Sequence, residues 1–401
     1  MNPAFERLVA YPFERLAQLK SGLEPPASLP HISLSIGEPK HPPPSFVIDR
    51  LREHLHELGS YPATRGLLPL RTAAARWLER RFALTENSVD AQSMVLPVNG
   101  TREALFAFTQ VVVNCRVSAP LVAMPNPGYQ IYEGATLLAG ADPFYLNTTA
   151  ANGFLPDLAA VPADVWQRCQ LLFLCSPANP VGTVMSVDYL QAALRLAERY
   201  DFIIASDECY ADIHDDESRP PPSLLSAAAS MGNTGFERCM SFHSLSKRSS
   251  LPGLRSGFVA GSASLIKSFL LYRTYHGCAM AEPTQHASIA AWNDDAHVIT
   301  NRALYRRKFD RVLPILAEAL PVMRPAGGFY VWLDTGGDDA AFTAGLFSQQ
   351  NVTVVPGSYL GRSTAAGNPG AGHVRISLVA AESECVQAAE RIRDFAVSLK
   401  K

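Results

Sequence analysis

One lysine in the segment 239–261 is a candidate nucleophile. The apolar run 240–242 is typical of a buried strand, and the polar turn Ser244-Leu245-Ser246 that follows it delivers Lys247. Arg255 comes eight residues later, before a second strand-like run at 257–260. A lysine in an apolar pocket can have a lowered pKa, which makes its neutral amine available to form a Schiff base. The segment therefore indicates an amine nucleophile beside a phosphate-binding arginine, although a solvated Lys–Arg pair on a loop has the same pattern.

Three further polar side chains follow predicted strands. Asn179 comes after one apolar run, and Asp207 and Tyr210 come after the next. Predicted strands alternate with predicted helices along this part of the chain, which favours a mostly parallel sheet. Ligands of such sheets bind beyond the carboxyl ends of the strands. We therefore expect Asn179, Asp207, Tyr210 and Lys247 to converge at one edge of the sheet.

A turn with anion-binding character lies earlier in the chain. The apolar run 94–98 predicts a strand, Asn99-Gly100-Thr101 a turn, and 102–113 a helix. Free backbone N–H groups and the helix dipole make such a helix N-terminus suitable for an anion. One turn of this kind is weak evidence when it stands alone.

The elements that position these residues fall into two predicted domains. Strands are predicted at 94–98, 121–124, 171–175, 202–205, 240–242 and 257–260, and helices at 49–58, 70–81, 102–113 and 189–199. A long helix over 282–320, kinked or broken near 293–295, is expected to lead into a small α+β domain containing the apolar runs 327–332, 352–357 and 373–378. The proline-rich residues 1–45 are expected to drape over the body. We predict a large domain at 46–289 and a small part formed by 1–45 and 290–401.

Composition limits the classes of function. The 401 residues are 47% apolar and 18% charged, with a net charge of −2, which gives no electrostatic reason to propose nucleic acid or a membrane surface as a partner. Residues 1–20 contain acidic and basic side chains and no apolar core, so we expect no signal peptide. Seven scattered cysteines without a C-x-x-C pair argue against disulfides and a zinc site. We expect a cytoplasmic location and predict no metal ligands.

These motifs together resemble the fold-type I pyridoxal-phosphate aminotransferases, the aspartate aminotransferase superfamily. They occur in the order and at the spacing found in that family, across nearly the whole chain. The matching motifs are Ser35-Ile36-Gly37-Glu38-Pro39, Tyr61-Pro62 with Gly66, Gly100-Thr101-Arg102-Glu103-Ala104-Leu105, Pro127-Gly128-Tyr129, Asn179-Pro180-Val181-Gly182, Asp207-Glu208-Cys209-Tyr210, Ser244-Leu245-Ser246-Lys247 with Arg255, and Arg375. The resemblance implies an α/β fold with a mostly parallel seven-stranded sheet covered by helices on both faces, plus a small α+β domain.

The resemblance also implies a role for each residue toward the cofactor, pyridoxal 5′-phosphate. Lys247 would bind it covalently and then move the substrate proton, with Asp207 facing the pyridine nitrogen. Asn179 and Tyr210 would contact its phenolic oxygen, and Tyr129 would stack on its ring. The phosphate would be bound by Ser244, Ser246, Arg255 and the backbone around Gly100, Thr101 and Arg102.

Substrate and partner contacts are implied in the same way. Arg375 would bind the α-carboxylate with Asn179 nearby, and Gly37 would leave room for the substrate. Arg102 could bind a distal carboxylate or be an exposed first-turn arginine. The enzyme would be a homodimer in which Tyr61 reaches the phosphate across the interface.

Four stretches narrow the resemblance to the proteobacterial succinyldiaminopimelate transaminases: 11–14, 97–106, 244–249 and 272–278. That subfamily implies glutamate and N-succinyl-LL-2,6-diaminopimelate as amino donors in a ping-pong reaction. Aminotransfer to another amino acid, such as aspartate or an aromatic one, is the main alternative. A lyase on the same scaffold also stays open, and a transcription regulator is disfavoured because few residues precede the strand before Gly37.

Two conspicuous features are expected to be structural. We expect His243 to satisfy a local hydrogen bond, since Lys247 already serves as the base. The run 329–332, Phe-Tyr-Val-Trp, is expected to belong to the core.

Overall fold

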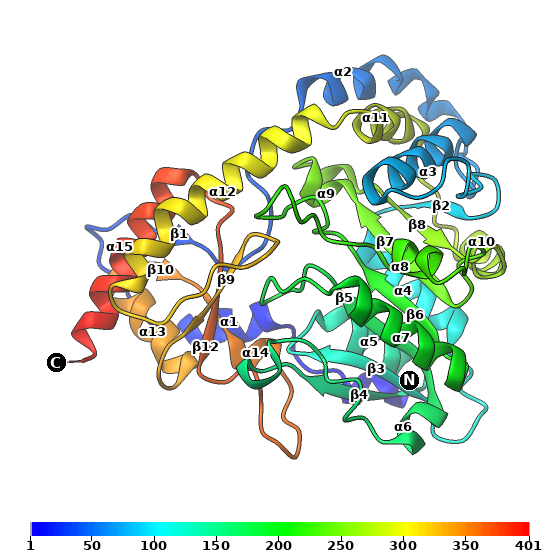
Figure 1. Ribbon diagram of the computed structural model, residues 1–401. Helices are drawn as coiled ribbons and strands as arrows, with labels where there is room; N and C mark the ends of the chain where they lie inside the picture. Colours follow the sequence, from blue (N-terminus) through cyan, green and yellow to red (C-terminus); the bar gives the residue numbers. More distant parts are fainter. Residues whose placement is uncertain (1, 401) are drawn as a thin grey trace.

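A seven-stranded mixed sheet forms the centre of the larger part of the computed structural model, which describes residues 2–400 (Figure 1). Its strand order is β2 (Val95–Val98), β8 (Gly257–Gly261), β7 (Cys239–Ser244), β6 (Ile203–Asp207), β5 (Cys169–Cys175), β3 (Leu121–Asn126) and β4 (Asp142–Asn147). Only β8 runs against its neighbours, because it pairs antiparallel with both β2 and β7. The predicted mostly parallel sheet is confirmed. The strand β4 was not among the predicted elements, because it is a half-exposed edge strand that includes Pro143, and a proline argues against a strand.

The central strands are buried on both faces, which explains their unbroken apolar runs. Along β5 the side chains alternate between the two faces: Leu172 and Leu174 pack on one face, and Leu171 and Phe173 pack on the other. The first face is covered by α3 (Leu68–Phe82), α6 (Ala163–Arg168), α7 (Val187–Tyr200) and α8 (Leu224–Ser230). The second is covered by α4 (Thr101–Val112), α5 (Gln130–Leu138) and α10 (Ala263–His276). Each fully buried Leu or Phe contributes about 1.5–3 kcal/mol, so this two-sided core fixes the strand ends that carry the site.

A smaller antiparallel sheet has an apolar core of its own. Its strands lie in the order β11 (Val355–Pro356), β12 (His373–Ser377) and β9 (Tyr330–Asp334). Residues from α12 (Ala296–Ala317), α13 (Asp339–Gln350) and α15 (Glu382–Ser398) pack against it. Beside it, β1 (Ile32–Ser33) pairs in parallel with β10 (Val352–Thr353), which ties the N-terminal segment to the small sheet.

Two consecutive helices connect the two sheets. α11 (Glu282–Asn293) lies over the large sheet, and α12 extends from it to the small one (Figure 1). The predicted break near 293–295 is confirmed. The Asp294 carboxylate accepts hydrogen bonds from the backbone and the ring of His297, which starts the new helix.

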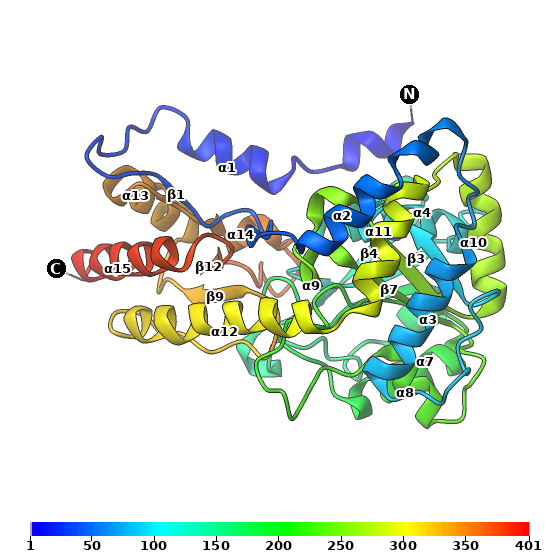
Figure 2. The same cartoon turned by 90° about the horizontal axis from the view of Figure 1, so that it is seen from above.

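The N-terminal segment differs from the prediction in two places. It contains helices η1 (Pro3–Arg7) and α1 (Pro12–Lys20), which run along the outside of the molecule (Figure 2). The predicted helix over 49–58 is instead α2 (Ser45–Glu53) followed by the 3₁₀ turn η2 (Leu55–Gly59). Helix α2 begins directly after Pro44, and His54 ends it with a non-helical backbone. None of the helices within residues 2–400 combines the length and the apolar character needed to cross a bilayer.

Candidate active site

A cavity of about 480 Å³ opens where the carboxyl ends of β5, β6 and β7 meet the small sheet. Twelve of the predicted site residues line it. They are Gly37, Thr101, Arg102, Tyr129, Asn179, Asp207, Tyr210, Ser244, Ser246, Lys247, Arg255 and Arg375. The structure thus brings together residues up to 338 positions apart, from Gly37 to Arg375, and their individual roles stay predictions.

Two predicted site residues lie outside this lining. Gly100 stands behind it at the N-cap of α4 with φ +84°, where an added Cβ would overlap the Arg255 guanidinium. Only glycine permits this backbone and this close approach. The Tyr61 side chain is fully exposed, so a contact with a cofactor would have to be made in another subunit.

Lys247 is carried by α9 (Leu245–Arg248), a single turn of helix where the sequence predicted a polar turn. Its ammonium donates to the Gly37 carbonyl at 2.5 Å and lies near the rings of Tyr210 and Phe329. Burial lowers the pKa of this amine to about 8. A much larger fraction of the amine is therefore neutral near pH 7 than in an exposed lysine, as a nucleophile requires.

The neighbouring Arg248 fixes the turn that carries the lysine. Its guanidinium donates to Asp212 at 2.7 Å, to Asp295 at 3.0 Å and to the Ala291 carbonyl at 2.7 Å. Asp212 is buried and also accepts from Arg81 at 2.8 Å. Removing one partner from such a buried ionic cluster costs about 3–5 kcal/mol, so the position of α9 is strongly determined.

Asp207 lies at the end of β6, 5% exposed, and burial raises the pKa of its carboxyl. Its Oδ2 accepts a hydrogen bond from the Tyr132 hydroxyl at 2.9 Å, and its Oδ1 accepts from the Cys209 N–H at 3.3 Å. Both bonds favour the ionised form against the effect of burial. Tyr132 was missed by the sequence analysis. No local signal was available, because Tyr129 lies before the first turn of α5 and the ring of Tyr132 packs on Phe173 as a core residue does.

Arg375 enters the cavity from β12 of the small sheet, 4% exposed. Its guanidinium donates to Asn179 Oδ1 at 2.9 Å and to the Ser35 carbonyl at 2.8 Å, and it lies over the ring of Tyr330. Its Nε has no hydrogen-bond partner among residues 2–400. These contacts fix the direction of the fork and leave donor capacity for a ligand.

Tyr330 corrects the interpretation of the run 329–332 as core alone. The residue is buried, but it lines the cavity, and its hydroxyl shares a 2.8 Å hydrogen bond with Tyr210. A Cβ at position 37 would overlap that hydroxyl, so Gly37 is needed here for space. The apolar sequence around Tyr330 concealed its polar end.

His243 also differs from its prediction. It is 1% exposed, and neither ring nitrogen has a hydrogen-bond partner within the described residues. Trp77, Phe82 and Phe258 surround the ring, and burial lowers its pKa to about 3. The expected local hydrogen bond is therefore wrong, because aromatic side chains enclose the ring and the Glu208 carboxylate, at 3.6 Å from Nε2, lies beyond hydrogen-bond distance.

The cavity is electropositive. Arg102, Lys247, Arg255 and Arg375 line it, and none forms a salt bridge with a carboxylate of residues 2–400. Arg255 donates to two backbone carbonyls, and Arg102 donates to the Tyr129 hydroxyl at 2.7 Å. Arginines without an acidic partner at a helix N-terminus and in a buried pocket suit anionic ligands.

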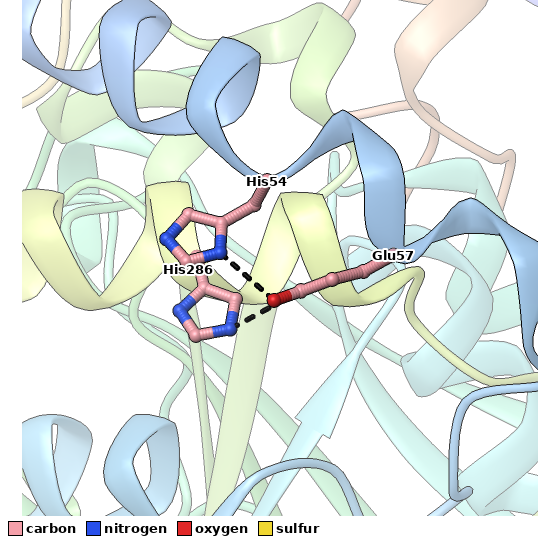
Figure 3. Close-up of side chains that lie close together, drawn as sticks. All are labelled: His54, Glu57 and His286. Carbon is pink, nitrogen blue, oxygen red and sulfur yellow. Dashed lines mark hydrogen bonds and ion pairs between the residues drawn. The ribbon is translucent and has the colours of Figure 1, made fainter.

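One cluster elsewhere has the side-chain types of a metal site. His54 Nδ1 lies 2.9 Å from one carboxylate oxygen of Glu57, and His286 Nε2 lies 3.3 Å from the other (Figure 3). The two imidazoles stack face to face, with centroids 3.6 Å apart and planes inclined by 3°. The lone pair of a ring nitrogen lies in the ring plane, so two parallel stacked rings do not point at a common ion. The arrangement is that of a carboxylate shared by two imidazoles.

Residues 30–392 match the model of the family described as aminotransferase class I and II. The chain belongs to this family. Its cofactor is accordingly pyridoxal phosphate.

Known relatives extend over the whole chain. An aminotransferase from Neisseria meningitidis is 49% identical with a TM-score of 0.94, and the match covers 100% of both chains. A probable N-succinyldiaminopimelate aminotransferase from Thermus thermophilus is 27% identical with a TM-score of 0.82, over 96% of this chain and 100% of that one. The LL-diaminopimelate aminotransferase of Desulforudis audaxviator is 32% identical over 96% of this chain and 95% of its own length.

The residues of the cavity fit pyridoxal phosphate. Asp207 is a buried carboxylate that lacks a cationic salt-bridge partner among residues 2–400, as a site for a protonated pyridine nitrogen requires. Arg255 and the N-terminus of α4 lie together beside Gly100, where a phosphate would be bound. Lys247 supplies the amine and Arg375 a second anion site.

Proposed function

We propose that this aminotransferase transfers an amino group between L-glutamate and N-succinyl-2-amino-6-oxopimelate, forming 2-oxoglutarate and N-succinyl-LL-2,6-diaminopimelate on the route to lysine. The observation that carries the reaction type is one cavity containing a buried amine of lowered pKa, a buried carboxylate and an arginine without a carboxylate partner among residues 2–400: Lys247, Asp207 and Arg375. The substrate is supported by the subfamily motifs and by the name of the Thermus relative.

Each of these residues has one task in the proposed reaction. Bound pyridoxal phosphate supplies an electron sink for the charge left on the substrate Cα when its proton is removed. Lys247 is the residue that would remove that proton as a base and then return it as an acid. Asp207 would keep the pyridine nitrogen of the cofactor protonated, and the hydrogen bond that it accepts from Tyr132 preserves the carboxylate charge.

The α-carboxylate of the substrate binds Arg375. The fork is already oriented by Asn179 and the Ser35 carbonyl, so little side-chain entropy is lost when the carboxylate arrives. Beside this fork, Tyr330 fixes the hydroxyl of Tyr210 through their shared hydrogen bond. Together these contacts orient the Cα–H bond toward Lys247.

Arg102 is proposed to bind a distal carboxylate. It lies at the mouth of the cavity, is exposed, and has only the hydroxyls of Tyr129 and Tyr11 as partners among the described residues. Glutamate and the succinylated substrate both carry extra carboxylates. Arg102→Gln should raise KM for both much more than for a neutral amino acid, whereas equal effects on all substrates would contradict this role.

A second candidate is free LL-diaminopimelate as the substrate. The observation that favours it is the name of several relatives of about 30% identity, among them the enzymes of Desulforudis audaxviator and Moorella thermoacetica. The two candidates differ at the end remote from the reacting amine, where one has a succinyl carboxylate and the other an ammonium group. Aspartate or an aromatic amino acid is the further alternative.

A homodimer is part of the proposal. Tyr61 is fully exposed beside the exposed Leu55 and Leu58, as expected of a segment covered by a second subunit. In that dimer Tyr61 would contact the phosphate bound by the partner subunit.

The test is a visible spectrum of the holoenzyme during titration with single amino compounds. Glutamate and N-succinyl-LL-2,6-diaminopimelate should each bleach the cofactor band, and 2-oxoglutarate should restore it. Faster bleaching by free LL-diaminopimelate would replace the proposed substrate with the second candidate. Bleaching by glutamate alone would exclude both, and a protein without a cofactor band after addition of pyridoxal phosphate would overturn the role of Lys247.

A further inference from the structure

A chain of hydrogen bonds connects the turn that carries Lys247 to the strand end behind Arg375. It consists of Asn301 and Lys308 on α12 and His41 in the loop between β1 and α2. Asn301 and Lys308 are seven residues apart, about two helical turns, so they lie on one face of α12. Asn301 is 7% exposed and Lys308 is 2% exposed.

The first link caps the turn of the lysine. Asn301 Nδ2 donates to the carbonyl of Lys247 at 3.1 Å and to the carbonyl of Arg248 at 3.0 Å. These carbonyls end α9 and have no partner within that four-residue helix. A single turn has no stability of its own, so its orientation depends on such tertiary bonds.

The chain has one consistent direction. The Lys308 ammonium can only donate, so the 2.7 Å contact makes His41 Nε2 an acceptor. His41 Nδ1 is then the protonated nitrogen, and it donates to Asn301 Oδ1 at 2.7 Å. That bond places the Asn301 NH₂ group on the two carbonyls of α9. Every group from the ammonium to the carbonyl of Lys247 is thus matched as donor and acceptor.

The far end of the chain lies in the small sheet. Lys308 also donates to the carbonyls of Leu378 at 3.1 Å and Val379 at 3.4 Å, three and four residues after Arg375. The three acceptors use all three hydrogens of a buried ammonium, which has no carboxylate partner within residues 2–400. The ring of His41 packs on Tyr305 at 4.5 Å, and its carbonyl accepts from Ser250 at 2.7 Å, so the middle of the chain is fixed as well.

We propose that Lys308, His41 and Asn301 are positioning residues that orient Lys247 relative to Arg375. The inference rests on the proposed roles of these last two residues. None of the three touches the cavity, so each acts through another residue. A displacement of a reacting group by about 1 Å can lower the rate about 100-fold, which is how distant bonds of this kind affect catalysis.

The experiment compares three single variants of the holoenzyme. Asn301→Ala should lower kcat by about 10- to 100-fold and leave KM for glutamate nearly unchanged, since Arg375 is not moved. It should also shift the pH midpoint of the cofactor's visible band, because that band reports the surroundings of the Lys247 nitrogen. Lys308→Met should lower kcat and also raise KM, because it releases the carbonyls behind Arg375. The variant His41→Ala should resemble Asn301→Ala.

The matched control is His297→Ala. His297 lies on the same helix and contacts the same turn through Ser249 at 2.8 Å, but it does not reach the carbonyl of Lys247. The backbone N–H of residue 297 keeps its bond to Asp294 in this variant, so the start of α12 is retained. Its kcat should stay within about twofold of the wild type and its band midpoint should not shift, as expected of a site that is not coupled to the chain.

A double variant separates positioning from simple loss of stability. Asn301→Ala and His41→Ala together should be no worse in kcat than the more severe single variant, because both interrupt one chain. Normal kcat and a normal band midpoint in Asn301→Ala would overturn the inference. So would multiplicative effects in the double variant, or an equal loss in His297→Ala. A protein that shows no cofactor chemistry even as wild type would refute the proposed function instead, before the variants are compared.

Discussion

The hydrogen bond from Tyr132 to Asp207 provides the sharpest test of the site, because the change removes a single atom. In Tyr132→Phe the ring can keep its stack on Phe173, whose centroid is 4.5 Å away at an angle of 14°. Packing is therefore preserved, while the 2.9 Å bond to the carboxylate is lost. Both residues are buried, so bulk water does not replace the missing donor.

The magnitude follows from the charge on the acceptor. A hydrogen bond to a charged group contributes about 1.5–3 kcal/mol, or roughly 10- to 150-fold in an equilibrium constant. The bond favours the ionised form of Asp207, and burial already raises its pKa, so its loss raises that pKa further. Asp207 therefore carries less of the negative charge that would pair with the protonated nitrogen of the cofactor. We expect the dissociation constant for pyridoxal phosphate to rise at least about tenfold and kcat to fall with it.

The assay is equilibrium titration of the cofactor-free protein with pyridoxal phosphate, followed by kcat at saturating cofactor. Tyr145→Phe is the matched control, since Tyr145 donates to Glu133 outside the cavity. It should bind the cofactor as the wild type does. A dissociation constant and a kcat for Tyr132→Phe within about twofold of the wild type would refute the reasoning. The loss of a hydrogen bond to a buried charge should change the dissociation constant by more than that.

Three other predictions follow from the contacts in the cavity. Gly37→Ala places a Cβ in overlap with the Tyr330 hydroxyl, so kcat/KM should fall about tenfold or more. As the control, serine in place of an exposed glycine with open space around it should leave kcat/KM unchanged. The rate at which cofactor-free protein captures pyridoxal phosphate should rise with pH around a midpoint of about 8, because burial lowers the pKa of Lys247 and the neutral amine reacts; a midpoint near that of a free lysine would contradict this. Arg375→Lys should raise KM for all amino acids roughly 10- to 150-fold, which corresponds to about 1.5–3 kcal/mol. A lysine cannot bond both Asn179 and a carboxylate through a planar fork, and an unchanged KM would refute that role.

Sequence reasoning was most successful where local pattern and chemistry coincide. Apolar runs identified the central strands, and the break before α12 followed from Asn293-Asp294-Asp295. Sequence reasoning failed where a single residue decides the outcome. His54 divides α2 from η2, and α1 was missed in a segment interpreted only as proline-rich.

The site shows the same division. Lys247, Asp207 and Arg375 could be predicted because each stands at a strand end or in an apolar run where a polar group is conspicuous. Tyr132 and Tyr330 could not be distinguished from core residues, since an aromatic ring on a buried face looks the same whether or not its hydroxyl has a partner.

The sequence by itself determined the order of strands and helices and the chemical types available at the strand ends. Periodicity and turn residues act over a few positions, so the chain carries this information locally. Only the tertiary structure decided which distant groups meet. His41 and Asn301 are 260 residues apart and Lys308 and Leu378 are 70 apart, yet each pair is hydrogen-bonded. Such bonds depend on how helices and sheets pack, because packing fixes the positions of donor and acceptor atoms to within a few tenths of an ångström. No local pattern in the sequence contains that information.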